Sequence, residues 1–86
     1  MIKVYCKAGC PQCDFAKVAL KRHGYKYEEV RIDEDDTARS FLIESGHRSV
    51  PQIYVNDTLL VEGGFAGLDK MTTKQIALRI REINGN

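Results

Sequence analysis

The chain has 86 residues, of which 43% are hydrophobic and 29% charged, and its formal net charge is +1. This length allows one small domain, and so weak a charge excludes strong electrostatic attraction to nucleic acid or to anionic membranes. No apolar run approaches the ~20 residues that a membrane helix needs, and the polar N-terminal stretch is too short for a signal peptide. We therefore expect a single cytoplasmic domain over residues 1–86, monomeric, with no nucleic-acid or membrane partner.

The first third of the chain predicts a strand, a helix and a second strand. The apolar stretch Ile2–Cys6 is typical of a short buried strand. After a turn, Pro11 suits the first position of a helix that continues to His23, because proline lacks the N–H that is unpaired there anyway. Gly24 ends this helix, and residues 25–32 are rich in strand-forming side chains.

The remaining elements are a helix, a hairpin and a last helix. Asp35 or Asp36 can cap the second helix, which Gly46 ends. Residues 51–55 and 58–61 flank a two-residue turn, which predicts a hairpin. Thr72 and Gln75 have the spacing of a capping box for the last helix, although a start near Leu68 is an alternative. The expected fold is α/β, with the order β-α-β-α-β-β-α and a four-stranded mixed sheet between three helices.

The pair Cys10 and Cys13 stands between the first strand and the first helix. Unpaired N–H groups and the helix dipole stabilise negative charge at a helix N-terminus, and thiolates at such places have pKa values of roughly 3.5–7.5 instead of about 8.5. Since the thiolate is the form that attacks disulfides, we expect Cys10 to be the exposed nucleophile and Cys13, one turn inside the helix, to be the resolving thiol. Lys7 adds positive charge nearby.

The third cysteine, Cys6, leaves an odd number of thiols, which speaks against a structural disulfide framework. Together the three cysteines have the spacing of a radical S-adenosylmethionine motif, but that chemistry needs a far larger barrel than this chain can form. A zinc site of the three cysteines with His23 or His47 is possible in principle, although His23 lies at the far end of the helix. We expect no bound metal and interpret Cys6 as a small hydrophobic residue of the strand, with an auxiliary redox role as the alternative.

Three motifs in order give the chain a resemblance to the glutaredoxin family: Cys10-Pro11-x-Cys13, then Ser49-Val50-Pro51, then Gly63-Gly64-Phe65. The resemblance extends over essentially the whole chain, and it implies a thioredoxin-like fold. It also implies that the Val50–Pro51 bond is cis and lies beside the active-site cysteine. With such a bond, the N–H and C=O of Val50 can pair with an extended substrate as a short added strand.

The resemblance further implies a thiol–disulfide oxidoreductase that uses glutathione as reducing co-substrate, with no bound cofactor. Its clients would be glutathione mixed disulfides and disulfide-containing proteins, with ribonucleotide reductase one of them by family analogy. The positions implied to contact glutathione are Lys7, Gln12, Arg39, Val50, Pro51, Gly63, Gly64 and Phe65.

The chain departs from the family pattern in ways that favour an alternative. Ala66 and Gly67 stand where glutaredoxins usually carry an acidic residue for the amino group of the ligand, and Asp69 comes later. Gln12 replaces a frequent tyrosine and resembles the glutaredoxin-like hydrogen donors of ribonucleotide reductase, which are recycled by thioredoxin reductase. A third hypothesis is a glutaredoxin that binds a [2Fe–2S] cluster, but the resemblance associates that mode with the loss of residues that are present here.

Overall fold

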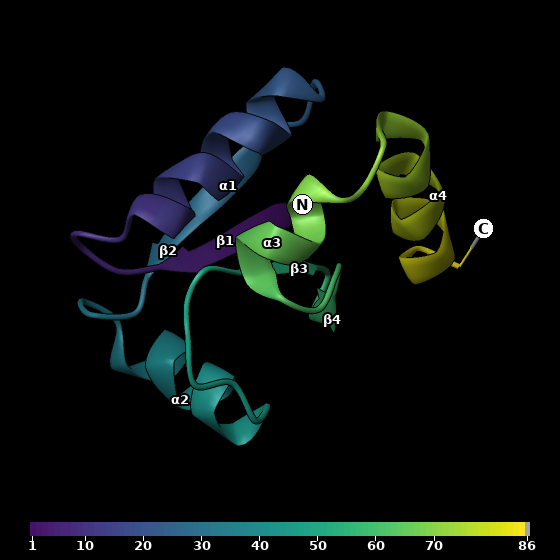
Figure 1. The fold of residues 1–86 in the computed structure, drawn as a ribbon. Coiled ribbons are helices and arrows are strands. Elements are labelled where there is room, and N and C mark those ends of the chain that lie inside the picture. Colours follow the sequence, from purple (N-terminus) through teal and green to yellow (C-terminus); the bar gives the residue numbers. More distant parts are fainter. Residues whose placement is uncertain (86) are drawn as a thin grey trace.

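The computed structural model describes residues 1–85 of the chain and contains four strands and four helices in that range (Figure 1). In chain order these are β1 (Ile2–Cys6), α1 (Pro11–Arg22), β2 (Tyr27–Arg31), α2 (Asp36–Glu44), β3 (Gln52–Val55), β4 (Thr58–Leu59), α3 (Gly64–Asp69) and α4 (Thr73–Ile83).

The strands form one mixed sheet in the order β2-β1-β3-β4. The central strand β1 pairs in parallel with β2 and antiparallel with β3, while β3 and β4 form the hairpin. Asn56 and Asp57 have positive φ angles of 49° and 68°, as the two central residues of a tight hairpin turn require. The predicted thioredoxin-like α/β fold is confirmed.

Two apolar cores lie on opposite faces of the sheet, because successive side chains of a strand alternate between the faces. Val4 of β1 packs in the larger core with residues of α1, α3 and α4, whereas its neighbour Tyr5 packs with Ala38 and Leu42 of α2 on the other face. Figure 1 shows α1 and α2 separated by the sheet. The first core holds α1 firmly on β1, and this fixes the position of the N-terminus of α1.

The number of helices is where the prediction was wrong, since α3 and α4 take the place of one C-terminal helix. Leu68 belongs to α3, a short helix that packs the side chain into the larger core. Thr72 then starts α4 in a new direction with the predicted capping box: its hydroxyl accepts from the N–H of Gln75 at 3.1 Å, and its own N–H donates to the Gln75 side chain at 2.9 Å. Local capping thus divides a segment that apolar periodicity alone reads as continuous.

The other boundaries differ from the prediction by a few residues. The second strand starts at Tyr27 and not at residue 25, and β4 ends at Leu59 and not at residue 61. The N–H of Leu60 still donates to the carbonyl of Ile53 on β3 at 2.8 Å, and Arg79 of α4 donates to the carbonyl groups of Leu59 and Leu60 at 3.1 Å each. Of the two predicted caps of α2, Asp35 and Asp36, it is Asp35 that accepts from the N–H of Ala38 at 3.0 Å. Within residues 1–85, no helix has the length and apolar character needed to span a membrane.

Candidate active site

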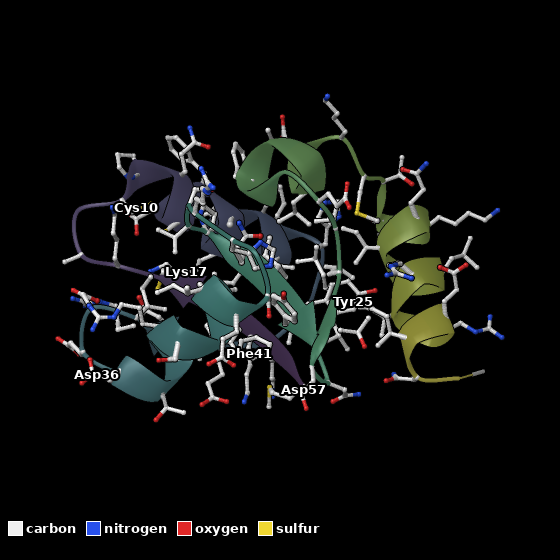
Figure 2. The ribbon with its side chains drawn as sticks, turned by 90° about the horizontal axis from the view of Figure 1, so that it is seen from below. Cys10, Lys17, Tyr25, Asp36, Phe41 and Asp57 are labelled. Atoms are coloured by element: carbon white, nitrogen blue, oxygen red, sulfur yellow. The ribbon has the colours of Figure 1, made fainter. Side chains whose placement is uncertain are left out.

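Cys10 is the residue that caps the N-terminus of α1. Its backbone is extended, with φ −110° and ψ 100°, and its Sγ accepts a hydrogen bond from the N–H of Cys13 at 3.2 Å. Pro11 occupies the first turn of the helix, as predicted. Figure 2 shows Cys10 at the end of α1, at the edge of the molecule. The partly exposed Cys10 therefore places its sulfur where the helix dipole and the N–H of Cys13 stabilise negative charge.

Cys13 is buried, with 1% of its surface exposed. Burial raises the pKa of the Cys13 thiol well above its usual range, and the hydrogen bond with Cys10 adds to the rise, while the backbone N–H of Lys7 acts in the opposite direction. Both thiols are free in this structure. One thiol is thus open to a partner while the other is sequestered one helical turn away, the arrangement that a two-step exchange requires.

Cys6 is also buried, on the face of the sheet that α1 covers, and its Sγ donates to Oε2 of Glu29 at 3.2 Å. Burial and this carboxylate together raise the pKa of the Cys6 thiol to about 12. It is a hydrogen-bonded polar group and not only a small hydrophobic residue. Among residues 1–85, no three histidine, cysteine or acidic side chains gather in a way that could hold a metal ion.

The bond between Val50 and Pro51 is cis, as the resemblance implied. The carbonyl oxygen of Val50 lies 3.9 Å from Sγ of Cys10. Gln52 is buried and donates its side-chain N–H to the carbonyl of Ser49 at 3.0 Å, which fixes this loop beside the cysteine. Within the described part of the chain, the N–H of Val50 has no hydrogen-bond acceptor, so it is available to a partner beside the carbonyl that faces Cys10.

The glycine pair brings the start of α3 against the proline loop. Gly64 has a φ angle of +58°, and a Cβ atom there would lie 2.7 Å from the carbonyl oxygen of Pro51. Only glycine permits this approach. Phe65 follows and packs on Phe15 of α1, with ring centroids 5.5 Å apart. The glycine pair therefore has a structural role in joining α3 to the active site, whatever ligand it contacts.

A groove of about 790 Å³ runs along these loops and brings together most of the residues implied to contact glutathione. Six of them line it, namely Gln12, Val50, Pro51, Gly63, Gly64 and Phe65. Lys7 and Arg39 are not in this groove. They line a smaller hollow of about 230 Å³ that shares Val50 with it. The site therefore consists of two adjoining hollows, with the cationic side chains in the smaller one.

Two charged residues of the groove were missed by the sequence analysis. Arg48 lines both hollows. The smaller hollow therefore has three basic side chains, those of Lys7, Arg39 and Arg48, and no acidic one among the described residues that line it. Glu62 lines the large groove beside the glycine pair. Their closeness to the motifs in the sequence could have indicated them, because Arg48 stands two residues before Val50 and Glu62 directly precedes Gly63.

Comparison with known proteins places this geometry in a family. The glutaredoxin family model matches residues 2–60. The probable glutaredoxin slr1562 of Synechocystis sp. is 39% identical over 72 residues, which cover 81% of this chain and 62% of that relative's length. The glutaredoxin-like protein NrdH of Lactococcus lactis subsp. lactis is 37% identical over 57 residues, covering 66% of this chain and 79% of the relative.

Solved structures agree with the sequence relatives. The NrdH-redoxin of Escherichia coli superimposes with a TM-score of 0.68 at 25% identity, and the match covers 90% of this chain and 91% of that one. The family match includes β1, α1 with both cysteines, and the Val50–Pro51 loop. This chain therefore belongs to the glutaredoxin family.

Proposed function

We propose that the chain reduces protein disulfides and glutathione mixed disulfides by a dithiol mechanism. The observation that carries the proposal is the contrast between Cys10, a partly exposed sulfur that accepts the Cys13 N–H at the start of α1, and Cys13, a buried thiol one turn away. A thiolate at Cys10 attacks one sulfur of the client disulfide, forming a mixed disulfide and releasing the first client thiol. Cys13 then attacks the Cys10 sulfur and the second thiol leaves, so that two electrons pass to the client.

We propose glutathione as the reducing co-substrate, bound along the groove. The N–H and C=O of Val50 would pair with the main chain of its cysteinyl residue, and the cations of the smaller hollow would hold its glycyl carboxylate. Glu62 offers a carboxylate to the ammonium of the γ-glutamyl group. Glu62 would thus take over the role of the acidic residue that is absent at positions 66 and 67.

The alternative is a hydrogen donor for ribonucleotide reductase that thioredoxin reductase recycles. Two observations favour it: Gln12 lines the groove where many glutaredoxins have tyrosine, and the chain is similar to proteins named NrdH, one of which is described as having a thioredoxin-like activity profile. Ribonucleotide reductase remains a proposed client under either electron source. The three free thiols suit a reducing compartment, and we propose the cytosol.

The first prediction concerns the electron source. The chain would be assayed on the glutathione mixed disulfide of 2-mercaptoethanol, with glutathione and glutathione reductase in one series and thioredoxin reductase in the other. We expect turnover with glutathione, and we expect Lys7→Met to raise the KM for glutathione about tenfold, because a charge-assisted contact is lost. Lys21→Met, on the exposed part of α1 away from the groove, is the matched control.

Turnover only with thioredoxin reductase would refute the glutathione contacts and establish the hydrogen donor. Cys10→Ser should abolish turnover in both series, and activity of that variant would refute the dithiol mechanism itself.

A further inference from the structure

Behind Cys13, polar side chains from three elements form a connected chain. Lys17 of α1 donates its Nζ to Oε2 of Glu29 on β2 at 3.0 Å and lies 3.4 Å from Oδ1 of Asp14. The same oxygen of Glu29 accepts the thiol of Cys6 on β1. The ammonium of Lys17 thus reaches from the helix to the sheet, where it shares a carboxylate oxygen with the thiol of the buried Cys6.

Lys17 stands four residues after Cys13 on α1, so the two side chains lie on the same face of the helix. Its side chain is only 19% exposed, whereas Lys21, one turn further on, is an exposed residue. Figure 2 shows Lys17 lying further inside the molecule than Cys10. The positive charge of Lys17 lowers the pKa of the Cys13 thiol, against the larger rise that burial causes. A cation in this place therefore favours the form of Cys13 that can attack a disulfide.

We propose that Lys17 is a positioning residue for the resolving step: its ammonium, held against the sheet by Glu29, stabilises the Cys13 thiolate as it attacks the mixed disulfide on Cys10. The inference rests on the proposed dithiol reaction. In this step the Cys13–Cys10 bond forms, the bond between Cys10 and the client sulfur breaks, and the client sulfur leaves with the electron pair. The proton of Cys13 ends on that departing thiolate. Cys6 takes no part in the exchange and serves as a donor that orients Glu29.

The other charged groups around Cys13 do not provide this field. Lys7 contacts Cys13 through its backbone N–H, and its side chain is exposed. Arg31, which is near Glu29 on β2, is paired with Asp33 at 2.7 Å. On α1 the nearest further charge is the carboxylate of Asp14, which lies beside Lys17. The short helix α3, which also packs on α1, carries one charged residue, Asp69, at its C-terminal end.

The test is a single-turnover reaction of the reduced protein with an aromatic disulfide probe, 5,5′-dithiobis(2-nitrobenzoate). Attack by Cys10 releases one coloured thiolate and attack by Cys13 releases the second, so the two steps are read separately. Lys17→Met removes the charge and keeps the length of the side chain, and we expect it to raise the apparent pKa of the second release by about one unit. Because a thiol of higher pKa is also more nucleophilic, the second release at neutral pH should slow by only about threefold to fourfold.

Two matched variants make the test specific. Lys17→Arg keeps the charge and should restore the rate and pH profile of the second release, and Lys21→Met should leave both unchanged. The proposal is overturned if the profile of Lys17→Met matches that of the unmodified protein, if both releases slow by the same factor, or if Lys21→Met has an equal effect. The probe needs neither glutathione nor a reductase, so failure of glutathione-linked turnover leaves this result intact. Absence of a second release in the unmodified protein would refute the dithiol mechanism and this inference with it.

Discussion

Three free cysteines lie close together in this chain, and their surroundings give them different chemistry. Cys10 is partly exposed at a helix N-terminus, while Cys6 and Cys13 are each 1% exposed. Cys6 differs from Cys13 in that it donates to a carboxylate, and a neighbouring negative charge disfavours its thiolate. Exposure and hydrogen bonding, more than residue type, therefore determine which sulfur exchanges.

Replacing Cys6 by serine tests this assignment. The serine hydroxyl can donate to Glu29 in place of the thiol, so Cys6→Ser should keep both releases from the aromatic disulfide within about twofold of the unmodified rates. The cost in unfolding free energy should be small, on the order of 1 kcal/mol, since the hydrogen bond is retained. Cys13→Ser is the contrasting variant and should release one thiolate only. Loss of the second release in Cys6→Ser would mean that Cys6 is a redox partner of Cys13.

At the scale of elements, the junction between β4 and α3 depends on close backbone contacts. Gly64 lies against Pro51, and a Cβ atom at Gly67 would lie 1.9 Å from the carbonyl oxygen of Glu62. Gly67 is inside α3, where glycine is otherwise unfavourable. Position 67 therefore requires glycine, because the turn that contains Glu62 folds back over it. The same turn places Glu62 in the groove.

Gly67→Ala should force the Glu62 segment to move. We expect a loss of roughly 1–3 kcal/mol in unfolding free energy, the usual cost of overpacking, together with a raised KM for glutathione. Urea unfolding and steady-state kinetics measure the two effects. Gly24→Ala is a matched control, because Gly24 has a φ angle of +89° with open space around its Cα. The control should lose stability, by about 1 kcal/mol, and keep its KM. Equal KM values for both variants would contradict the link between this turn and the groove.

At the scale of the whole molecule, two buried thiols connect folding stability to alkaline pH. Unfolded cysteines ionise near pH 8.5, whereas burial raises the pKa of Cys6 to about 12 and shifts that of Cys13 in the same direction. Because the pKa of each thiol is raised in the folded state, the stability that the protonated thiol contributes is fully present below about pH 8.5. It is lost as the pH rises toward the pKa of the folded state. Each such thiol lowers the unfolding free energy by about 1.4 kcal/mol per pH unit in this window.

We therefore expect urea midpoints, measured with a phosphine reductant, to fall between about pH 8.5 and pH 12. Cys6→Ser removes one of the two groups, and its stability should decline less steeply by about 1.4 kcal/mol per pH unit. The difference between the two curves isolates Cys6, because tyrosines and lysines titrate in both proteins. Parallel curves would show that Cys6 ionises equally in the folded and unfolded states.

The sequence by itself determined the strand order along the chain, the hairpin, the capped helix starts and the position of Cys10 and Cys13 at the mouth of α1. These are local properties, since each depends on the periodicity or capping of a few neighbouring residues. The cap at Thr72 lies at the predicted capping box, and Asp35 is one of the two caps predicted for α2. The division between α3 and α4 was missed because the burial of Leu68 depends on contacts with distant elements.

Only the tertiary structure determined that the site consists of two adjoining hollows, and that Lys17 and Cys6 both bond to Glu29. Arg48 and Glu62 carry no motif, and they enter the site because two separate loops meet at one groove. The bonds from Lys17 and Cys6 to Glu29 join α1, β1 and β2. The physical reason is that side chains far apart in sequence share a dielectric environment and hydrogen-bond partners only after the sheet and its covering helices have formed.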